Sequence, residues 1–315
     1  MNNDSDKRFP WIYDRIKSTK SQCGEDGVIE AIFEKIGTTN KNFVDLGAYD
    51  PVRISNSFNF ISEKSWPGVL IESNIDRFQK CENYYKDRND VACINKKVDR
   101  SNTLDDILDE IDFPDSYDVL SIDIDSIDYF VWSDHIRRPR VVIIECNPSI
   151  DTDISFIQRD FSQENIGNSA RALVDLGREK GYELVAHLLV NCIFVVKEEF
   201  SKLEIEDNSL ERLFTSPFVP RVISDLRGNH YLIKPGVWGY RSVTGLDNLS
   251  HNDGYDSSIS MYNSINHEMY DIEYSSKIGN FKYHNNWNVV ETLTTFINSN
   301  YNDSRDQDPP WKKKK

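Results

Sequence analysis

Between residues 22 and 197, short apolar runs alternate with segments whose apolar residues recur at helical spacing. The clearest runs are FVDL (43–46), GVLIE (68–72), YDVLSIDID (117–125) and PRVVIIE (139–145), and a weaker one is VACINKKVD (91–99). Consecutive apolar positions are typical of parallel strands, which are buried on both faces. Helical patterns lie at 22–37, 101–111 and 168–180, a polar helix is expected up to about residue 86, and 182–197 predicts two closing strands. The alternation predicts an α/β fold with an open, mostly parallel sheet.

Acidic residues stand at the ends of four of these predicted strands. They are Asp45, Glu72, Asp123 with Asp125, and Glu145. The carboxyl ends of parallel strands share one edge of a sheet, and ligands bind in the crevice at that edge. Like charges that converge there raise one another's pKa unless a cation or hydrogen-bond donors compensate. We therefore expect a ligand that brings positive charge, hydroxyl groups or a metal ion.

The stretch FVDLGAYDP (43–51) passes from the first strand into a turn through Gly47. A dinucleotide site needs more glycines after the first, so that the backbone can approach a pyrophosphate. Tyr49 stands at the second glycine position, and Pro51 offers no amide donor. S-adenosylmethionine has no phosphate, carries a sulfonium and an ammonium, and offers ribose hydroxyls to an acid such as Glu72. It suits a one-glycine turn beside carboxylates.

Composition narrows the classes of partner. The chain has 315 residues and a formal net charge of −15, which disfavours nucleic acid and anionic membranes as partners. It shows neither a signal-peptide core nor an apolar run of membrane-span length, so we expect a cytoplasmic protein. Its five cysteines lie far apart in the sequence without a C-x-x-C pair, a pattern that favours reduced core thiols over a zinc site.

Six segments in order along residues 20–197 resemble the FkbM-like methyltransferases, which depend on S-adenosylmethionine. They are SQCGEDGVIEAIF (21–33), FVDLGAYDPVRISNS (43–57), WPGVLIESNIDRF (66–78), LSIDIDSIDYFVW (120–132), PRVVIIECNP (139–148) and ALVDLGREKGYELV (172–185). The chain departs from the family's pattern at Pro51, where the family usually has glycine, and at Ser126, where glycine commonly follows the acid.

The resemblance implies a seven-stranded, mostly parallel Rossmann-like sheet of the class I methyltransferase type. It covers a cofactor-binding domain at 21–199, after a lead-in at 1–20. The change to a composition rich in Asn, Ser, Asp and Tyr marks a polar, aromatic-containing C-terminal extension at 200–315, which has no match in the family. Within that extension, aromatic residues around 229–240 favour some ordered packing.

The resemblance also implies roles for individual residues. Gly47 and Ala48 would line the methionine part of the cofactor, with Asp45 near its ammonium. Glu72 would hold the ribose hydroxyls and Ser73 would border the adenine. The remaining cofactor-binding candidates are Gln22, Glu25, Asp99 and Asp123.

For catalysis, methyl transfer to a hydroxyl benefits from a base. Asp125 is the first candidate, because it lies two residues after Asp123 and so on the same side of an extended strand; His135 is the second. Asp123, Asp125 and Glu145 can instead hold magnesium or manganese, which prefer oxygen ligands. The family's association with glycans and natural products points to O-methylation of a sugar hydroxyl, on a glycan, a polysaccharide precursor or a small molecule.

Two other functions remain open at this point. The D-x-D of Asp123 and Asp125 is also typical of glycosyltransferases that bind a nucleotide-sugar through manganese. A catalytically inactive methyltransferase fold could serve as a binding module, with the C-terminal region as its contact surface.

Overall fold

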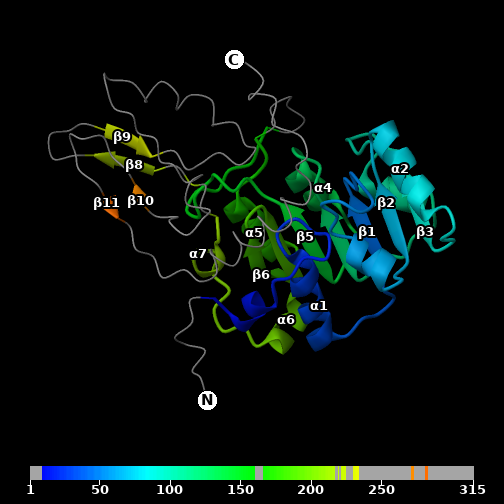
Figure 1. The fold of residues 1–315 in the computed structure, drawn as a ribbon, viewed down its shortest axis with the longest axis horizontal. Helices are drawn as coiled ribbons and strands as arrows, with labels where there is room; N and C mark the ends of the chain where they lie inside the picture. The colour runs from blue at the N-terminus through cyan, green and yellow to red at the C-terminus, as the bar shows by residue number, and fades with distance from the viewer. Residues whose placement is uncertain are drawn as a thin grey trace. The chain divides into compact units, whose positions relative to one another are not determined.

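A computed structural model of the chain describes residues 9–159, 166–216 and 219, and the backbone of four short strands beyond Pro220. Backbone contacts divide the chain into two compact units, Met1–Pro220 and Arg221–Lys315 (Figure 1).

A seven-stranded sheet forms the centre of the first unit (Figure 1). Its strands are β1 (Phe43–Leu46), β2 (Gly68–Ile71), β3 (Val91–Ile94), β4 (Val119–Ile122), β5 (Val141–Glu145), β6 (Tyr182–Leu188) and β7 (Asn191–Val196). They lie in the order β3-β2-β1-β4-β5-β7-β6. The first five run parallel, whereas β7 runs antiparallel to both β5 and β6. This order, with one reversed strand, is the Rossmann-like sheet of the class I methyltransferase fold, which confirms the expected fold class.

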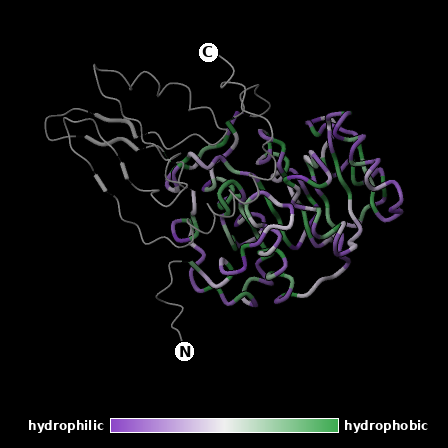
Figure 2. The backbone as a smooth tube through the Cα atoms, in the orientation of Figure 1, coloured by the Kyte–Doolittle hydropathy of each residue, from purple (hydrophilic) through white to green (hydrophobic). Residues whose placement is uncertain are grey.

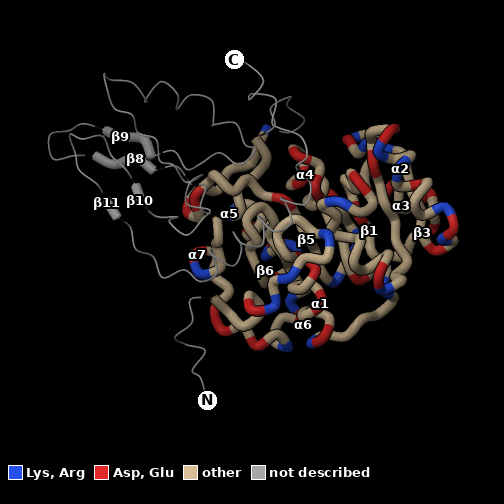
Figure 3. Tube along the Cα trace, viewed as in Figure 1, with Lys and Arg blue, Asp and Glu red and all other residues tan. Residues whose placement is uncertain are grey.

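The strands form the hydrophobic core of this unit. Every residue of β1, β2, β4 and β7 is buried. Because successive side chains of a strand point to opposite faces, the sheet is covered on both sides. Hydrophobic residues are concentrated along these strands (Figure 2), and charged residues lie mostly outside them (Figure 3).

Helices connect the strands, and several begin where the sequence supplies a cap. The side chain of Asn74 accepts two amide hydrogen bonds at the start of one helix, and Thr103 and Asp106 form a capping box at the start of another. The helices are α1 (Glu25–Ile36), α2 (Ile75–Tyr85), α3 (Leu104–Asp109), α4 (Asp128–Asp134), α5 (Ala170–Glu179), α6 (Lys197–Phe200) and α7 (Leu210–Leu213), with short turns η2 (Trp11–Arg15), η3 (Asn59–Glu63) and η4 (Ser201–Leu203).

Several elements are shorter than the sequence predicts. The strand predicted over 117–125 spans Val119–Ile122, so Asp123 and Asp125 lie in the loop after it and not on one side of an extended strand. The helix predicted from residue 22 begins at Glu25, because Gly24 has a φ of 96° and breaks the helical path. The strand predicted over 91–99 ends at Ile94. Beyond it the chain turns, and Asp99 forms an isolated antiparallel bridge with Asn102.

The lead-in segment and the residues after 199 meet within the first unit. The indole nitrogen of Trp11 donates to the carbonyl of Leu203 at 2.7 Å, and the hydroxyl of Tyr13 donates to the carbonyl of Leu213 at 2.7 Å. The turn η2 and the segment after residue 199 are therefore tied to each other over the hairpin of β6 and β7, since the amide of His187 donates to the Tyr13 hydroxyl at 2.9 Å.

The second unit contains two antiparallel strand pairs among its described residues. β8 (Arg221–Ser224) pairs with β9 (His230–Ile233), and β10 (Asp271–Ile272) pairs with β11 (Phe281–Lys282). Of the segment 229–240, only the backbone of β9 lies within the described residues. Across the part of the chain that the structure describes, no helix combines the length and the apolar character needed to cross a membrane.

Candidate active site

The carboxyl ends of β1, β2, β4 and β5 lie side by side at one edge of the sheet. Backbone hydrogen bonds align them: the amide of Asp123 donates to the carbonyl of Leu46, and the amide of Gly47 to that of Ile71, both at 3.0 Å. The order of strands reverses between β1 and β4, since β2 and β3 lie beyond β1 on one side and β5 lies beyond β4 on the other. In open α/β sheets, this switch point is where ligands bind.

Gly47 allows the turn after β1 to approach the end of β4. Its φ is 88°, and a Cβ placed on it would lie 1.8 Å from the carbonyl oxygen of Asp123. No other residue fits without moving one backbone away from the other. The single glycine of the motif is thus required by contact with a neighbouring loop.

Tyr49 lies in the same turn, at the second glycine position of a dinucleotide motif. Its backbone has a φ of 43°, the residue is 46% exposed, and the guanidinium carbon of Arg77 lies 4.2 Å from its ring centroid. The amide of Tyr49 donates to the carboxylate of Glu72 at 2.9 Å. That donor is therefore occupied by a protein carboxylate.

Glu72 connects the loops that follow β1 and β2. Its side chain is buried, and its second carboxylate oxygen accepts the amide of Asn74 at 2.7 Å. The side chain of Asn95, beyond β3, donates to the carbonyls of Glu72 and Ser73 at 2.8 and 3.2 Å. Ser73 is exposed and Ala48 is buried. The carboxylate of Glu72 is thus held rigidly between two loops of the crevice.

Asp45 lies within β1 rather than after it, and it is buried. The hydroxyl of Ser57 donates to it at 2.6 Å, and Ser121 of β4 lies beside it in the sheet register. Burial raises the pKa of Asp45 to about 6, against hydrogen bonds from Ser57 and Ser121 that lower it. Near neutral pH this carboxylate is a buried negative charge without a basic partner among the groups that shift its pKa.

Three carboxylates gather after β4 and β5. One oxygen each of Asp123, Asp125 and Glu145 lie within 4.8 Å of one another. Burial, with the charges of Asp128, Asp125 and Asp45, raises the pKa of Asp123 well above its usual value. Asp125 is exposed, and its backbone φ of 64° turns the chain sharply after Asp123. The structure therefore brings together the three residues that the sequence suggested as metal ligands.

Asp128 joins this group, although the sequence did not single it out. It is buried and accepts the amides of Ile124 and Ser126 at 2.9 and 3.0 Å, which fixes the loop that carries Asp125. Burial raises its pKa to about 6. Its position in the first turn of α4 was a usable signal, because acids are favoured there.

Glu25 reaches the same edge from the first turn of α1. It is fully buried, and it accepts the side-chain amide of Asn191 at 2.8 Å and the backbone amide of Cys23 at 2.7 Å. Asn191 pairs with Glu145 in the sheet. Burial raises the pKa of Glu25. Gln22 lies in the preceding turn and is half-buried.

The loop before α1 is held by an acid that sequence reasoning missed. One carboxylate oxygen of Asp26 accepts the amides of Thr19, Lys20 and Ser21 at 2.7, 3.0 and 3.1 Å. The amide of Ser55 donates to the carbonyl of Lys20 at 3.0 Å, which ties this loop to the segment after the Gly47 turn.

Asp99 and His135 lie elsewhere. Asp99 is half-buried and accepts the amide and the hydroxyl of Ser101 at 2.8 and 2.7 Å, so it closes its own turn. Asp99 and His135 line the same small cavity, together with Asp105.

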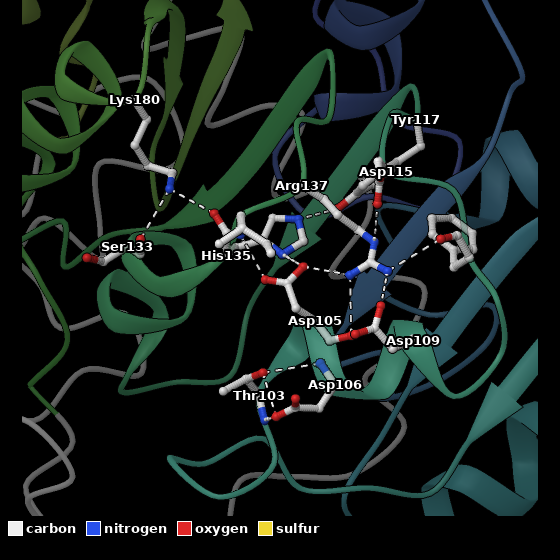
Figure 4. Close-up of polar contacts among 12 residues, drawn as sticks. Thr103, Asp105, Asp106, Asp109, Asp115, Tyr117, Ser133, His135, Arg137 and Lys180 are labelled. Carbon is white, nitrogen blue, oxygen red and sulfur yellow. Dashed lines mark hydrogen bonds and ion pairs between the residues drawn. The ribbon is translucent and has the colours of Figure 1, made fainter.

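The structure does not bring His135 to Asp125. The ring of His135 is buried, with Nε2 2.8 Å from the hydroxyl of Tyr117 and Nδ1 3.1 Å from a carboxylate oxygen of Asp105 (Figure 4). Tyr117 precedes β4, whereas Asp125 follows it. Because α4 runs back along the strand, His135 at its end lies toward the opposite edge of the sheet, within an ion-pair network that includes Arg137 (Figure 4).

Comparisons with solved structures find methyltransferases at low similarity. The N-terminal domain of EvdMO1, solved with SAH and D-fucose, aligns at 11% identity over 56% of this chain and 82% of that one, with a TM-score of 0.37. An O-methyltransferase from Bacillus cereus, in complex with SAH, aligns at 16% identity over 58% and 86%, with a TM-score of 0.38. A SAM-dependent methyltransferase from Aquifex aeolicus aligns at 9% identity over 53% and 87%, with a TM-score of 0.32.

No family model matches the chain, and no curated protein matches it. The order and direction of its seven strands identify the sheet as that of a class I methyltransferase fold.

Proposed function

We propose that the protein is an S-adenosylmethionine-dependent methyltransferase of the FkbM-like type, which methylates a sugar hydroxyl of a glycan, a polysaccharide precursor or a natural product. The observation that carries this proposal is the cluster of buried and half-buried acids at the switch point of the sheet, around a turn with one glycine. Asp45, Glu72 and Asp123 come from three neighbouring strands and meet beside Gly47.

The charge of this crevice favours a cationic ligand. Asp45 and Asp123 have raised pKa values because they are buried close to other acids. When a ligand with an ammonium and a sulfonium binds, its positive charges would attract these carboxylates and offset the repulsion among them. A pyrophosphate would add negative charge, and the amide of Tyr49, which could meet it, already donates to Glu72. The acidic crevice therefore supports a methyl donor over a dinucleotide or a nucleotide-sugar.

The cofactor would lie across the ends of β1, β2 and β4. Glu72 would accept the ribose hydroxyls, and Ser73 would border the adenine. Gly47 and Ala48 would line the methionine part, with Asp45 and Asp123 near its ammonium. Gln22 and Glu25 would close the site from the lead-in segment.

Transfer would occur by in-line displacement. The acceptor oxygen attacks the methyl carbon opposite the sulfur, the carbon–sulfur bond breaks as the carbon–oxygen bond forms, and the hydroxyl proton passes to the carboxylate of Asp125. Alignment of the two reactants supplies much of the rate, with effective molarities of about 10⁵ M or more in well-oriented cases. Asp125 suits the role of base because it is exposed at the edge of the cluster.

A divalent ion fits the same cluster. The three oxygens of Asp123, Asp125 and Glu145 lie close enough together to share one ion, and oxygen ligands suit magnesium or manganese. When bound, such an ion supplies positive charge that polarises a neighbouring hydroxyl. These residues would hold the ion, and Asp128 would keep the loop of Asp125 in place through its two amide hydrogen bonds.

Isothermal titration calorimetry with S-adenosylmethionine and S-adenosylhomocysteine, with and without magnesium, tests the proposal. We expect micromolar binding of both by the full chain. Glu72→Ala should weaken it roughly 10- to 100-fold, the value of hydrogen bonds to a charged group. Glu82→Ala, which removes an exposed acid of α2, is the matched control and should bind normally. Absence of binding in both conditions would overturn the proposal in favour of a nucleotide-sugar enzyme or an inactive binding module.

A further inference from the structure

Three metal-binding side chains meet in the core where β5, β6 and β7 join. Cys146 follows β5, His187 lies in β6, and Cys192 lies opposite His187 in β7. All three are buried, with at most 2% of their surface exposed. One ligand atom from each lies within 4.8 Å of the others. The crevice chemistry proposed above uses none of them.

The spacing of these atoms suits a single ion. Zinc binds cysteine sulfur at about 2.3 Å and histidine nitrogen at about 2.0 Å, so two ligands of one tetrahedral ion are roughly 3.5–3.8 Å apart. The Sγ of Cys146 and the Nε2 of His187 are 3.5 Å apart. The set therefore needs little movement to close around an ion.

The imidazole of His187 is fixed by its second nitrogen. Nδ1 lies 3.2 Å from both the hydroxyl oxygen and the amide nitrogen of Thr215. The amide of Thr215 donates to Nδ1, which places the proton of the neutral ring on Nε2; when Nε2 binds an ion, that proton moves to Nδ1, which then donates to the Thr215 hydroxyl in place of accepting from the amide. The Thr215 hydroxyl is itself held, since it donates to the carbonyl of His187 at 2.8 Å and accepts the amide of Leu189 at 3.0 Å. Partners of this kind orient metal-binding histidines.

We propose that Cys146, His187 and Cys192 bind one divalent ion that prefers thiolate ligands, such as zinc. The charge balance favours a divalent ion at this buried site. Two thiolates and a neutral imidazole carry a total charge of minus two, which the ion neutralises. Binding releases the two thiol protons, and the proton on Nε2 is replaced by one on Nδ1. The ion would link Cys146, the residue after Glu145, to the hairpin of β6 and β7.

The first test is the metal content of the full-length protein. We expect about one zinc per chain by mass spectrometry of the elements, in protein produced with zinc in the medium. Because the site is buried, cobalt(II) should be introduced during refolding. Excess magnesium is added to compete with cobalt for the acidic crevice. One equivalent of cobalt should give the near-ultraviolet absorption of a thiolate–cobalt bond.

Variants separate this site from others. Cys146→Ser and Cys192→Ser should each abolish the absorption, whereas Cys81→Ser, which changes a buried cysteine of α2, should retain it. Thr215→Val should lower the affinity for cobalt about 10- to 100-fold, as loss of an orienting partner does.

Three results would overturn the proposal. Folded wild-type protein with less than a tenth of an equivalent of zinc and no thiolate–cobalt absorption would show an ordinary core of thiols. Full metal content in the Cys146→Ser/Cys192→Ser double variant would place the ion elsewhere. A mass two units lower, with only Cys23, Cys81 and Cys93 reacting as thiols in the unfolded chain, would show a Cys146–Cys192 disulfide. None of these readouts depends on methyl transfer, so the test stands apart from the proposed function.

Discussion

Replacing Asp45 with asparagine should stabilise the ligand-free protein at neutral pH while it weakens cofactor binding. Asparagine keeps an oxygen that can accept the hydrogen bond from Ser57, which is 2.6 Å long in the native protein. It removes a buried negative charge whose formation is opposed by burial and by the nearby charge of Glu72. The variant therefore separates the effect of this acid on the stability of the protein from its effect on cofactor binding.

The size of the effect follows from the pKa of Asp45, which rises from 3.8 to about 6 on folding. A raised carboxylate pKa means that the folded state binds the proton more tightly. Its destabilising contribution is small below the unfolded pKa, grows as the pH rises from about 4 to 6, and is constant above that. A shift of about two pKa units corresponds to about 3 kcal/mol at full ionisation, of which about 2 kcal/mol develops between pH 4.5 and 7.5.

Urea unfolding of both proteins at these two pH values measures the difference. The free energy of unfolding of Asp45→Asn relative to wild type should rise by about 2 kcal/mol from pH 4.5 to 7.5. Ser57→Ala is the informative control: it removes a hydrogen bond that lowers the pKa of Asp45, so its loss of stability should grow with pH instead. A difference between Asp45→Asn and wild type that does not change with pH would refute the reasoning.

Three further predictions concern other parts of the structure. Gly47→Ala should lower the free energy of unfolding by about 3 kcal/mol or more, because the new Cβ meets the carbonyl of Asp123 and the residue has a positive φ; a loss below about 1 kcal/mol in urea unfolding would contradict this close contact. Asp105→Asn should cost about 3 kcal/mol at neutral pH, because it breaks a buried ion pair with Arg137. Burial opposes ionisation of Asp105, but its ionic and hydrogen-bonded partners lower its pKa overall, so this cost should shrink as the pH falls below about 4, and an equal cost at acid pH would refute it. Asp125→Asn should slow turnover about 10²-fold or more with unchanged cofactor binding by calorimetry, and an unchanged rate would move the base elsewhere.

The fold could be predicted because the apolar runs in the sequence match the buried strands of a parallel sheet. The apolar runs that become β1, β2, β4 and β5 are buried on both faces, and the segments between them are long enough for the crossover connections that parallel strands need. The position of β7 could not be derived from the pattern, since a hairpin of two apolar strands can join a sheet by either strand. That choice depends on the match of its side chains to β5.

The acids of the site could be predicted because the carboxyl ends of parallel strands must share an edge. Glu25 reaches that edge through Asn191, a contact that depends on the register of an antiparallel strand and so cannot be seen in the sequence. For His135 a signal was available: a helix that follows a parallel strand runs back toward its start, so a residue at the helix end lies away from the crevice.

The reversed strand also bears on how the chain is made. β7 is the last strand of the sheet in the sequence, yet it lies between β5 and β6. During synthesis, β5 therefore keeps an unpaired apolar edge until Val196 has left the ribosome, and β6 has no partner in the sheet before then. Unpaired apolar edges pair readily with other chains. Truncation within 191–196 should thus yield an aggregating chain.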